Sequence, residues 1–440
     1  MTELLTPDHH DYDATRRVHN GLVDRHPAVI ARCRSTADVA DAVRLARQRE
    51  LEICVRGGGH NVAGRAVIDG ALMIDLAPMK RISVDPASRT VVAEPGLTWG
   101  EYNDAAAAHG LATTGGVVST TGIAGLTLGG GFGWIQGAYG LTIDNLLAAE
   151  LVTADGDLLR IDSDRHQDLF WAIRGGGGNF GVVTSFTYRA HPIEHVVGGA
   201  VAWPVNQAAD TLRLYRQVVA EAPDQLMAQA ALLTGPDGTT KVAGISMCHC
   251  GSPEQAAADI DPIRKHGASL IDAVDEMPYA ARNSASDTSF PKGALNYWKS
   301  AFLTDLTDEA IDTLVASFMR CPSAMSLCLL EPIHGAVTRI DPTATAFPHR
   351  SRGFNLLLLG QWADPVNNDA NVAWVRDTFE AMSPHLAGGR YVNYLSADDT
   401  NDIARAYGPN WERLVTIKQR YDPTNVFRHN QNIDPGRGTP

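Results

Sequence analysis

The sequence predicts an α+β protein made of more than one domain. Its 440 residues exceed the roughly 100–200 residues of a typical domain, and a hydrophobic content of 44% is enough to bury a sizeable core. Segments with helical and with strand-like patterns alternate along the whole chain, and the clusters of glycine disappear after Pro192. The alternation of helical and strand-like segments without glycine clusters after that proline is typical of an α+β domain.

The first part of the chain is predicted to combine short strands, helices and glycine-rich loops. A helix is expected over residues 35–51, because a Ser-x-x-Asp start precedes Val39, Val43 and Ala46 at helical spacing. A strand at 52–55 follows, and Asp69-Gly70 predicts a hairpin between strands 66–68 and 72–74. The remaining expected elements are strands at 81–84, 90–93, 151–153, 158–160 and 182–188, and helices at 99–109 and 166–173.

After Pro192, helical and strand-like patterns alternate without glycine clusters. We expect helices at 207–221 and 253–265, and strands at 228–233, 242–247 and 354–359. The chain is then expected to be helical from residue 400 to 418 and to enter a turn followed by an Asn-rich stretch.

Charge and composition exclude several classes of protein. The formal net charge of -13 opposes a general affinity for nucleic acid or for an anionic membrane. No stretch approaches the ~20 apolar residues of a membrane span, and no leader pattern opens the chain, so a cytoplasmic location is expected. Six dispersed cysteines predict free thiols, and Cys248-His249-Cys250 lacks the second ligand pair of a zinc site, so no metal is expected.

Glycine-rich segments are the strongest indication of a ligand. Residues 57–61 form a tight turn directly after a strand, where consecutive backbone N–H groups make an anion nest. Residues 115–140 combine dense glycine with aromatic side chains; a loop packed for steric reasons alone is the alternative to a ligand surface. Gly176-x-Gly178-x-x-Gly181 matches the dinucleotide pattern, but a helix precedes it and a strand follows, the reverse of a Rossmann unit.

Four ordered motifs and two late ones resemble the berberine-bridge-enzyme-like branch of flavoenzymes, which have the vanillyl-alcohol-oxidase, or PCMH-type, FAD-binding fold. The resemblance covers most of the chain. The motifs are RGGGHNVAG at 56–64, TTGIAGLTLGGG at 120–131, YGLTIDN at 139–145, GNFGVV at 178–183, YVNY at 391–394, and the stretch at 421–433 that contains YDP and FRHNQNI.

The resemblance implies FAD bound with its pyrophosphate on residues 57–61 and attached covalently through His60 to the methyl of its dimethylbenzene ring. Many relatives have a second, cysteinyl attachment where this chain has Val118, so we expect a link through His60 only. The resemblance implies that the other contacts to FAD come from Arg56, Gly57, Gly58, Gly59, Asn61, Thr120, Thr121, Gly122, Gly125, Leu128, Gly129, Gly131, Tyr139, Gly140, Asn179, Gly181, Val182, Val183, Asn430 and Asn432.

Catalysis is expected to need a base that takes a hydroxyl proton as hydride leaves for the flavin. In the family the second tyrosine of Tyr-x-Asn-Tyr often plays this part, which implies Tyr394. Tyr391 is the weaker candidate, because alternate residues of a strand face opposite sides. A cation would have to lower the pKa of the tyrosine. Trp298, Asn355 and Gln361 are expected substrate contacts, although a core or strand-end position explains them equally well.

The family implies a PCMH-type FAD-binding domain with a second α+β substrate domain that carries an antiparallel sheet. We expect residues 1–195 in the first domain, 196–399 in the second and 400–440 returning to the first. The predicted function is oxidation of a hydroxyl-bearing small molecule, a sugar, alcohol or secondary metabolite, with oxygen or another acceptor reoxidising the flavin. A flavin-binding protein without turnover and a reductase on the same FAD scaffold stay open as alternatives, and so do the substrate and the oligomeric state.

Overall fold

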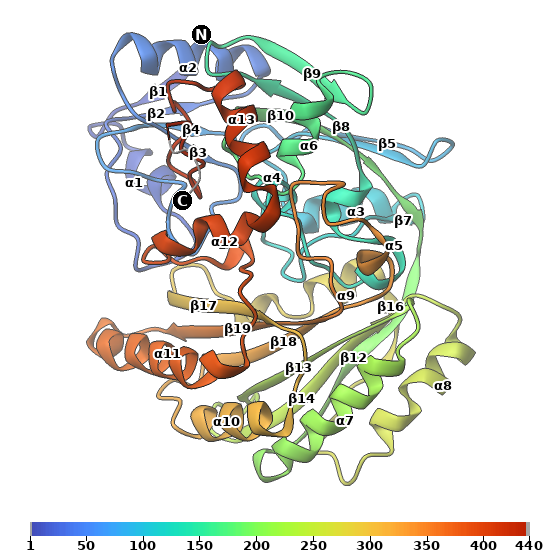
Figure 1. The fold of residues 1–440 in the computed structure, drawn as a ribbon. Coiled ribbons are helices and arrows are strands. Elements are labelled where there is room, and N and C mark those ends of the chain that lie inside the picture. Colours follow the sequence, from blue (N-terminus) through green and yellow to red (C-terminus); the bar gives the residue numbers. More distant parts are fainter. Residues whose placement is uncertain (1, 437–440) are drawn as a thin grey trace.

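The computed structural model describes residues 2–436. Two halves of the molecule are stacked on each other: the N-terminal part and the end of the chain form one half, and a large sheet with its helices forms the other (Figure 1). Among the described residues, no helix has the length and apolarity that crossing a bilayer requires.

The first half contains a small sheet in the order β1-β2-β4-β3. Its strands are β1 (Glu3–Leu5), β2 (Val29–Arg32), β3 (Ile53–Arg56) and β4 (Leu72–Asp75), and it is flanked by α1 (Tyr12–Arg16) and α2 (Thr36–Gln48). The predicted α2 is confirmed, and the Ser35 hydroxyl caps it by accepting the Asp38 N–H.

The hairpin predicted through Asp69-Gly70 is wrong. Residues 66–68 form no strand, and β4 instead pairs in parallel with β2 on one side and β3 on the other. All four residues of β4 are buried, as expected for a central parallel strand. Burial of β4 between two neighbours overrides the local turn signal.

A five-stranded antiparallel sheet, in the order β5-β6-β10-β8-β9, completes this half. Its strands are β5 (Ile82–Asp85), β6 (Thr90–Ala93), β8 (Leu146–Val152), β9 (Leu158–Asp162) and β10 (Val182–Arg189). Between them lie α3 (Trp99–Ala107), α4 (Ile123–Leu128), α5 (Gln136–Tyr139) and α6 (Gln167–Ile173), and β7 (Leu111–Ala112) pairs with β11 (His191–Pro192). Because α6 precedes and β10 follows the 176–181 glycines, the argument against a Rossmann unit is confirmed.

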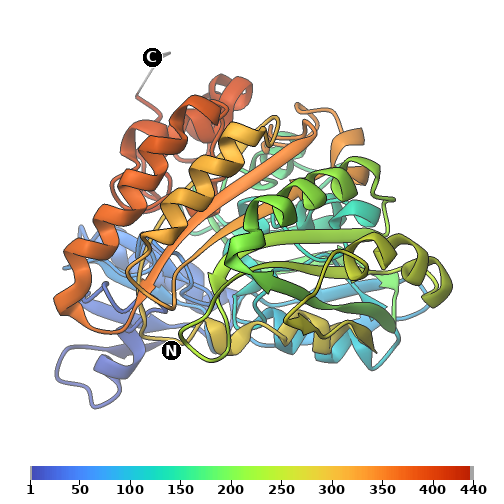
Figure 2. The same ribbon diagram turned by 90° about the horizontal axis from the view of Figure 1, so that it is seen from below.

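The second half is an eight-stranded antiparallel sheet covered on one face by helices, as Figure 2 shows from below. Its strands are β12 (His195–Pro204), β13 (Leu226–Thr234), β14 (Lys241–His249), β15 (Ile271–Asp272), β16 (Asp275–Pro278), β17 (Leu295–Leu303), β18 (Leu327–Ile333) and β19 (Gly353–Trp362). The covering helices are α7 (Ala208–Glu221), α8 (Pro253–Arg264), α10 (Asp308–Met319) and α11 (Asn368–Met382), and α9 (Tyr279–Ser284) follows β16.

The alternation of side chains on β18 and β19 separates the core from the face toward the other half. Cys328, Leu330, Leu356 and Leu358 belong to the core beneath the helices. Leu329, Glu331, Leu357 and Leu359 point the opposite way, into a cavity.

The C-terminal segment, as far as the structure describes it, packs on the first half. The continuous helix predicted over 400–418 is divided into α12 (Ile403–Tyr407) and α13 (Trp411–Tyr421) by a turn at Gly408, whose φ of 48° and following proline end α12. Arg420 on α13 forms an ion pair of 2.7 Å with Asp168 on α6. Figure 1 shows α13 next to α6.

Candidate active site

Two adjoining cavities occupy the centre of the molecule. The first, of about 980 Å³, lies between the N-terminal sheets and the C-terminal segment and is called here the Arg65 cavity. The second, of about 1250 Å³, lies between the two halves and is called the Glu331 cavity. The two share the lining residues Val55, Gly57, Asn61, Ala66, Gly125 and Asn393, so they adjoin each other.

Two glycine loops meet at this junction. The 57–61 loop follows β3, where Arg56 is held by an ion pair of 2.8 Å with Asp75 of β4. A Cβ on Gly58 would overlap the backbone of Gly122, so the loops approach each other more closely than any other residue type allows. This contact places His60 next to the start of α4.

His60 is held by both neighbouring threonines. Its Nε2 lies 3.0 Å from the Thr120 Oγ1, its Nδ1 lies 3.4 Å from the Thr121 Oγ1, and its ring stacks on His19 with centroids 3.9 Å apart. Burial, with the positive charge of His19 and Lys292, lowers the pKa of His60 to about 3. The imidazole is therefore neutral and keeps a lone pair on one ring nitrogen. His19 carries no sequence signal and was not predicted.

Tyr391 and Tyr394 lie on the same side of the chain, which corrects the expectation of a strand. Residues Val392–Tyr394 form a 3-10 turn, in which side chains three apart eclipse, and the two rings meet edge to face at 4.8 Å. The Tyr391 hydroxyl accepts the Gly131 N–H (3.0 Å) and an N–H of Asn393 (2.9 Å). Both tyrosines line the Glu331 cavity.

Glu331 is the charged group at this cavity that sequence reasoning missed. The β18–β19 register places it opposite Asn355, whose Nδ2 donates to Oε2 at 2.8 Å, while the Tyr394 hydroxyl donates to Oε1 at 3.2 Å. Burial raises the pKa of Glu331 to about 7. The only available signal was one acidic residue in an apolar strand.

The partner of Tyr394 is thus a carboxyl group, not the expected cation. Burial and the neighbouring Glu331 raise the pKa of Tyr394 well above its ordinary value. Among residues 2–436, the lining of the Glu331 cavity includes neither lysine nor arginine. The rest of the lining is largely apolar, and Trp298 stands edge-on to Tyr394 at 5.9 Å. The apolar side chains include Leu126, Phe132, Phe290, Trp298, Leu329, Leu357 and Leu359.

Most of the predicted contacts converge on the two cavities. The Arg65 cavity is lined by Gly57, Asn61, Gly125, Leu128, Gly181, Val182, Val183 and Asn430. The Glu331 cavity is lined by Gly57, Gly58, Gly59, His60, Asn61, Thr121, Gly122, Gly125, Trp298, Tyr391 and Tyr394.

The remaining predicted residues line neither cavity. Tyr139 stacks on His191, Asn179 holds the C-terminal segment, and the Gln361 amide donates to Ser289 O at 2.8 Å. Those outside the lining of both cavities are Arg56, Thr120, Gly129, Gly131, Tyr139, Gly140, Asn179, Asn432, Asn355 and Gln361.

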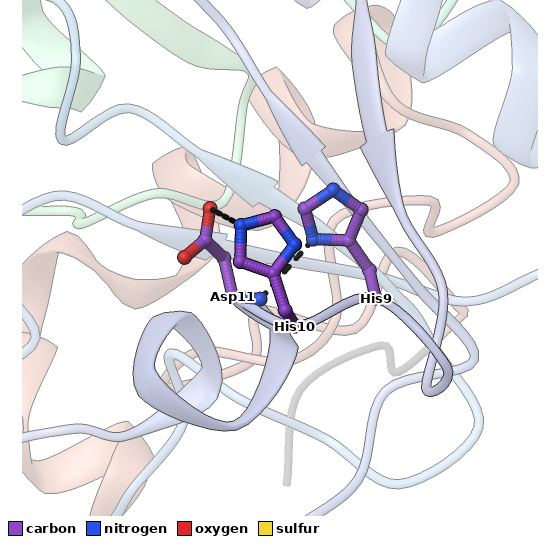
Figure 3. A group of neighbouring side chains, drawn as sticks. All are labelled: His9, His10 and Asp11. Atoms are coloured by element: carbon purple, nitrogen blue, oxygen red, sulfur yellow. Dashed lines mark hydrogen bonds and ion pairs between the residues drawn. The ribbon is translucent and has the colours of Figure 1, made fainter.

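Metal-ligating side chains elsewhere do not contribute to the cavities. Figure 3 shows His9, His10 and Asp11 on the turn before α1, with ligand atoms within 4.8 Å of one another. The His9 Nδ1 already accepts the Asp11 N–H at 3.2 Å, and none of the three lines either cavity. His249 pairs with Asp259 at 3.0 Å, and Cys248 is buried in a hydrophobic cluster.

Two family models match the chain. The FAD binding domain matches residues 27–162, and the berberine and berberine-like model matches residues 390–434. The (R)-6-hydroxynicotine oxidase of Paenarthrobacter nicotinovorans is 32% identical over 448 residues, which cover 98% of this chain and 96% of that protein.

Solved structures have the same fold. The crystal structure of 6-hydroxy-D-nicotine oxidase from Arthrobacter nicotinovorans superposes with a TM-score of 0.91 at 30% identity, covering 99% of this chain and 98% of that one. Glucooligosaccharide oxidase from Acremonium strictum, which carries a 6-S-cysteinyl, 8α-N1-histidyl FAD, superposes with a TM-score of 0.89 at 24% identity, covering 99% and 97%. This second similarity is one of fold alone.

Proposed function

The chain belongs to the berberine-bridge-enzyme-like FAD-linked oxidoreductases, and from this premise we propose that it oxidises a hydroxyl-bearing small molecule in the Glu331 cavity. The observation that carries the proposal is that the buried Glu331 carboxyl and the Tyr394 hydroxyl bonded to it face the same cavity as His60. A proton acceptor and the expected position of the flavin therefore lie at the same cavity. Oxidation of an alcohol requires this, because the hydroxyl proton and the hydride leave the substrate from neighbouring atoms.

The residues present fit FAD. Gly125 of α4 has open space where a Cβ would lie, and the buried polar atoms of Asn430 and Gln431 beside the Arg65 cavity include several without a hydrogen-bond partner. These residues, with the 57–61 loop, would hold the cofactor through both cavities. Bound FAD accepts a hydride, that is, a proton with two electrons, from the substrate carbon.

His60 is proposed as the covalent attachment point. Its neutral imidazole has the lone pair that bond formation requires, and Thr120 and Thr121 orient the ring. Val118 lies in the lining at the place where relatives carry a cysteine, and none of the six cysteines lines either cavity among residues 2–436. We therefore propose a histidyl link without a cysteinyl one.

Acid precipitation tests this link. The yellow colour of the flavin-loaded protein is expected in the pellet, and that of the His60→Ala variant in the supernatant. Mass spectrometry of the tryptic peptide that contains His60 should then show the added mass of the flavin. Release of all colour from the unaltered protein would contradict the covalent proposal.

Tyr394 and Glu331 are proposed to remove the substrate proton together. As the C–H bond breaks, the hydroxyl proton passes to the Tyr394 oxygen and the tyrosine's own proton passes to the Glu331 carboxylate. The carboxylate, with a pKa of about 7, is available as acceptor near neutral pH. The phenol itself stays neutral before and after the transfer, so no cation is needed beside it.

The walls of the cavity favour an apolar substrate with few polar groups. Aromatic and leucine side chains surround Glu331, and burying the many hydroxyls of a sugar against them would leave those hydroxyls unpaired. Of the sugar, alcohol and secondary-metabolite classes, we therefore propose an aromatic or otherwise apolar alcohol or hydroxylated metabolite.

Anaerobic flavin reduction tests the reaction. Benzyl-type alcohols and heteroaromatic compounds that carry a hydroxymethyl group have a hydrogen on the carbon that bears the hydroxyl, and they are expected to bleach the flavin absorbance; glucose and cellobiose are not. Bleaching by the sugars alone would overturn the substrate class. A loaded protein that none of these reduces, although apolar alcohols perturb its spectrum, would instead act by binding.

Oxygen is the proposed acceptor. The inference comes from the 6-hydroxynicotine oxidases, which are 30–32% identical to this chain and are named oxidases. Reoxidation of the reduced enzyme should be fast when air is admitted, and adding a dye should not accelerate it. Dependence on the dye would make the enzyme a dehydrogenase.

A further inference from the structure

The guanidinium of Arg65 lies at the Arg65 cavity without an anionic partner. Among residues 2–436, it forms none of the ion pairs of the structure, and its buried Nε has no hydrogen-bond partner. Burial, together with the charge of Arg25, lowers the pKa of Arg65, although the neighbouring Tyr407 opposes this shift.

Two hydrogen bonds to Asn61 fix the position of Arg65 at the Arg65 cavity. The Gly64 N–H donates to Asn61 O at 3.0 Å, and the Arg65 N–H donates to the Asn61 Oδ1 at 3.2 Å. This turn brings Arg65 back beside the end of the 57–61 loop, whose backbone N–H groups form the expected anion nest. Arg65 therefore lines the same cavity as Gly57 and Asn61 of this loop.

The rest of the Arg65 cavity is free of negative charge. Its lining contains glycine, apolar, amide and aromatic side chains, the imidazole of His429 and, within the described part of the chain, no aspartate or glutamate. His429 pairs with Glu52, which does not line the cavity. In a protein of net charge -13, a cavity lined by a partly buried cation and by no acid is suited to an anion. The neighbouring Arg25 does not fill this role, because its guanidinium donates to the carbonyls of Gly64 and Val67 at 3.2 Å.

We infer that Arg65 binds the pyrophosphate of FAD as a charge-assisted hydrogen-bond donor. Arg65 lines the cavity away from His60, at the part of the path where the phosphates and not the flavin ring would lie. A guanidinium presents paired N–H groups to phosphate oxygens, and the pair stabilises both charges in a dry site. The inference rests on FAD binding and not on the proposed reaction.

Comparison of FAD with riboflavin, which lacks phosphates, tests this inference. In a His60→Ala background, where binding is reversible, Arg65→Leu is expected to raise the Kd of FAD by about 10- to 100-fold and to leave the Kd of riboflavin unchanged. Arg65→Lys should recover part of the loss. The control is Arg160→Leu, which removes an exposed arginine on β9 that lines neither cavity.

An equal rise in the Kd of FAD and of riboflavin would overturn the inference, because it would show that Arg65 maintains the structure of the loop and does not bind the phosphates. No rise for FAD would overturn it as well. Inorganic pyrophosphate gives an independent measurement on flavin-free protein with His60 intact: it should raise the thermal midpoint of the unaltered chain and not that of Arg65→Leu. Equal shifts in the two proteins would contradict an ionic role. Neither measurement uses substrate. Both results can therefore be interpreted even if the proposed reaction is wrong.

Discussion

Tyr394 and Glu331 act as one proton acceptor in the proposed reaction, because the phenol donates to the carboxyl group at 3.2 Å. Tyr394→Phe should slow anaerobic flavin reduction by about 10²- to 10⁴-fold, the usual effect of losing a positioned base, with flavin content unchanged. Tyr391→Phe should slow it less, since the Tyr391 hydroxyl is already bonded to Gly131 and Asn393. The measurement is stopped-flow absorbance of the flavin.

The reverse order of the two tyrosine variants would make Tyr391 the base. Glu331→Gln keeps the size of the side chain and removes the acceptor, so it should slow reduction to a similar extent. If Glu331→Gln has full activity, the carboxyl group has no part in proton transfer.

Glu331 should also set the pH dependence of the rate. Since its pKa is about 7 and the proposed acceptor is the carboxylate, the rate of flavin reduction should rise with pH through about 7 and then level off. The Glu331→Gln variant should lack this rise. A rate that falls over the same range would show that the protonated carboxyl is the active form.

The same carboxyl group makes a predictable contribution to stability. Its pKa in the folded protein, about 7, lies above the ordinary value of 4.5, so the folded state binds the proton more tightly. This stabilisation is fully present below pH 4.5 and is lost as the pH rises through 7. Relative to Glu331→Gln, the free energy of unfolding should fall by about 3 kcal/mol between pH 5 and pH 8, as measured by denaturant titration. A constant difference would contradict the raised pKa.

Helix α4 is the element that presents its backbone to both cavities, and Gly125 is where it does so. Gly125→Ala should lower the ratio of bound flavin to protein, because the new methyl group projects into the space assigned to FAD. The protein itself should stay folded, since a Cβ there meets no atom within 4 Å and alanine favours a helix by about 0.5–1 kcal/mol over glycine.

Gly388→Ala is the matched control, because a Cβ at this exposed position also meets nothing within 4 Å and the residue lines neither cavity. Its flavin content should equal that of the unaltered protein. Flavin ratios are read from absorbance and circular dichroism reports the fold. Full flavin content in Gly125→Ala would show that the cofactor does not pass this face of α4.

At the scale of the whole molecule, the C-terminal segment closes the Arg65 cavity from the far end of the sequence. Lys418 of α13 is fully buried, pairs with Asp422 at 2.7 Å and donates to Asn179 O at 2.7 Å. The Asn179 side chain in turn donates to Gln431 O at 3.0 Å and accepts the Ile433 N–H at 2.9 Å. Asn179 therefore joins the 176–181 glycine turn to the final residues.

Removal of residues 400–440 should abolish FAD binding, because Asn430 and Gln431 leave the cavity wall and Leu414 and Ile433 leave the core. Asn179→Ala is the milder test. It removes the side-chain hydrogen bonds of Gly176 O, Gln431 O and the Ile433 N–H. The Tyr407 hydroxyl still donates to the two oxygens, so the main loss is the partner of the Ile433 N–H, at about 1–3 kcal/mol, which should lower both the unfolding midpoint and the flavin content. A shortened chain that binds FAD fully would refute this role of the segment.

Local sequence determined those features whose physics is local. The cap at Ser35, the glycine turn around His60 and the helix-before-strand order at the 176–181 glycines depend on neighbouring residues, and the structure has each of them. The family motifs predicted the fold, and most of the site residues predicted from them line the cavities. The limits of the domains and the roles of the site residues remain predictions.

Tertiary structure alone decided the features that depend on distant partners. Glu331 and Tyr394 are 63 residues apart, and only the register of β18 with β19 and the turn at 392–394 brings them together. The hairpin at Asp69-Gly70 failed for the same reason, since β4 pairs with strands that no local signal specifies. Nothing in the sequence distinguishes Arg65 from the other arginines. Only the structure shows that its Nε is buried without a hydrogen-bond partner. Leaving such a group unpaired costs free energy because water has been removed from around it.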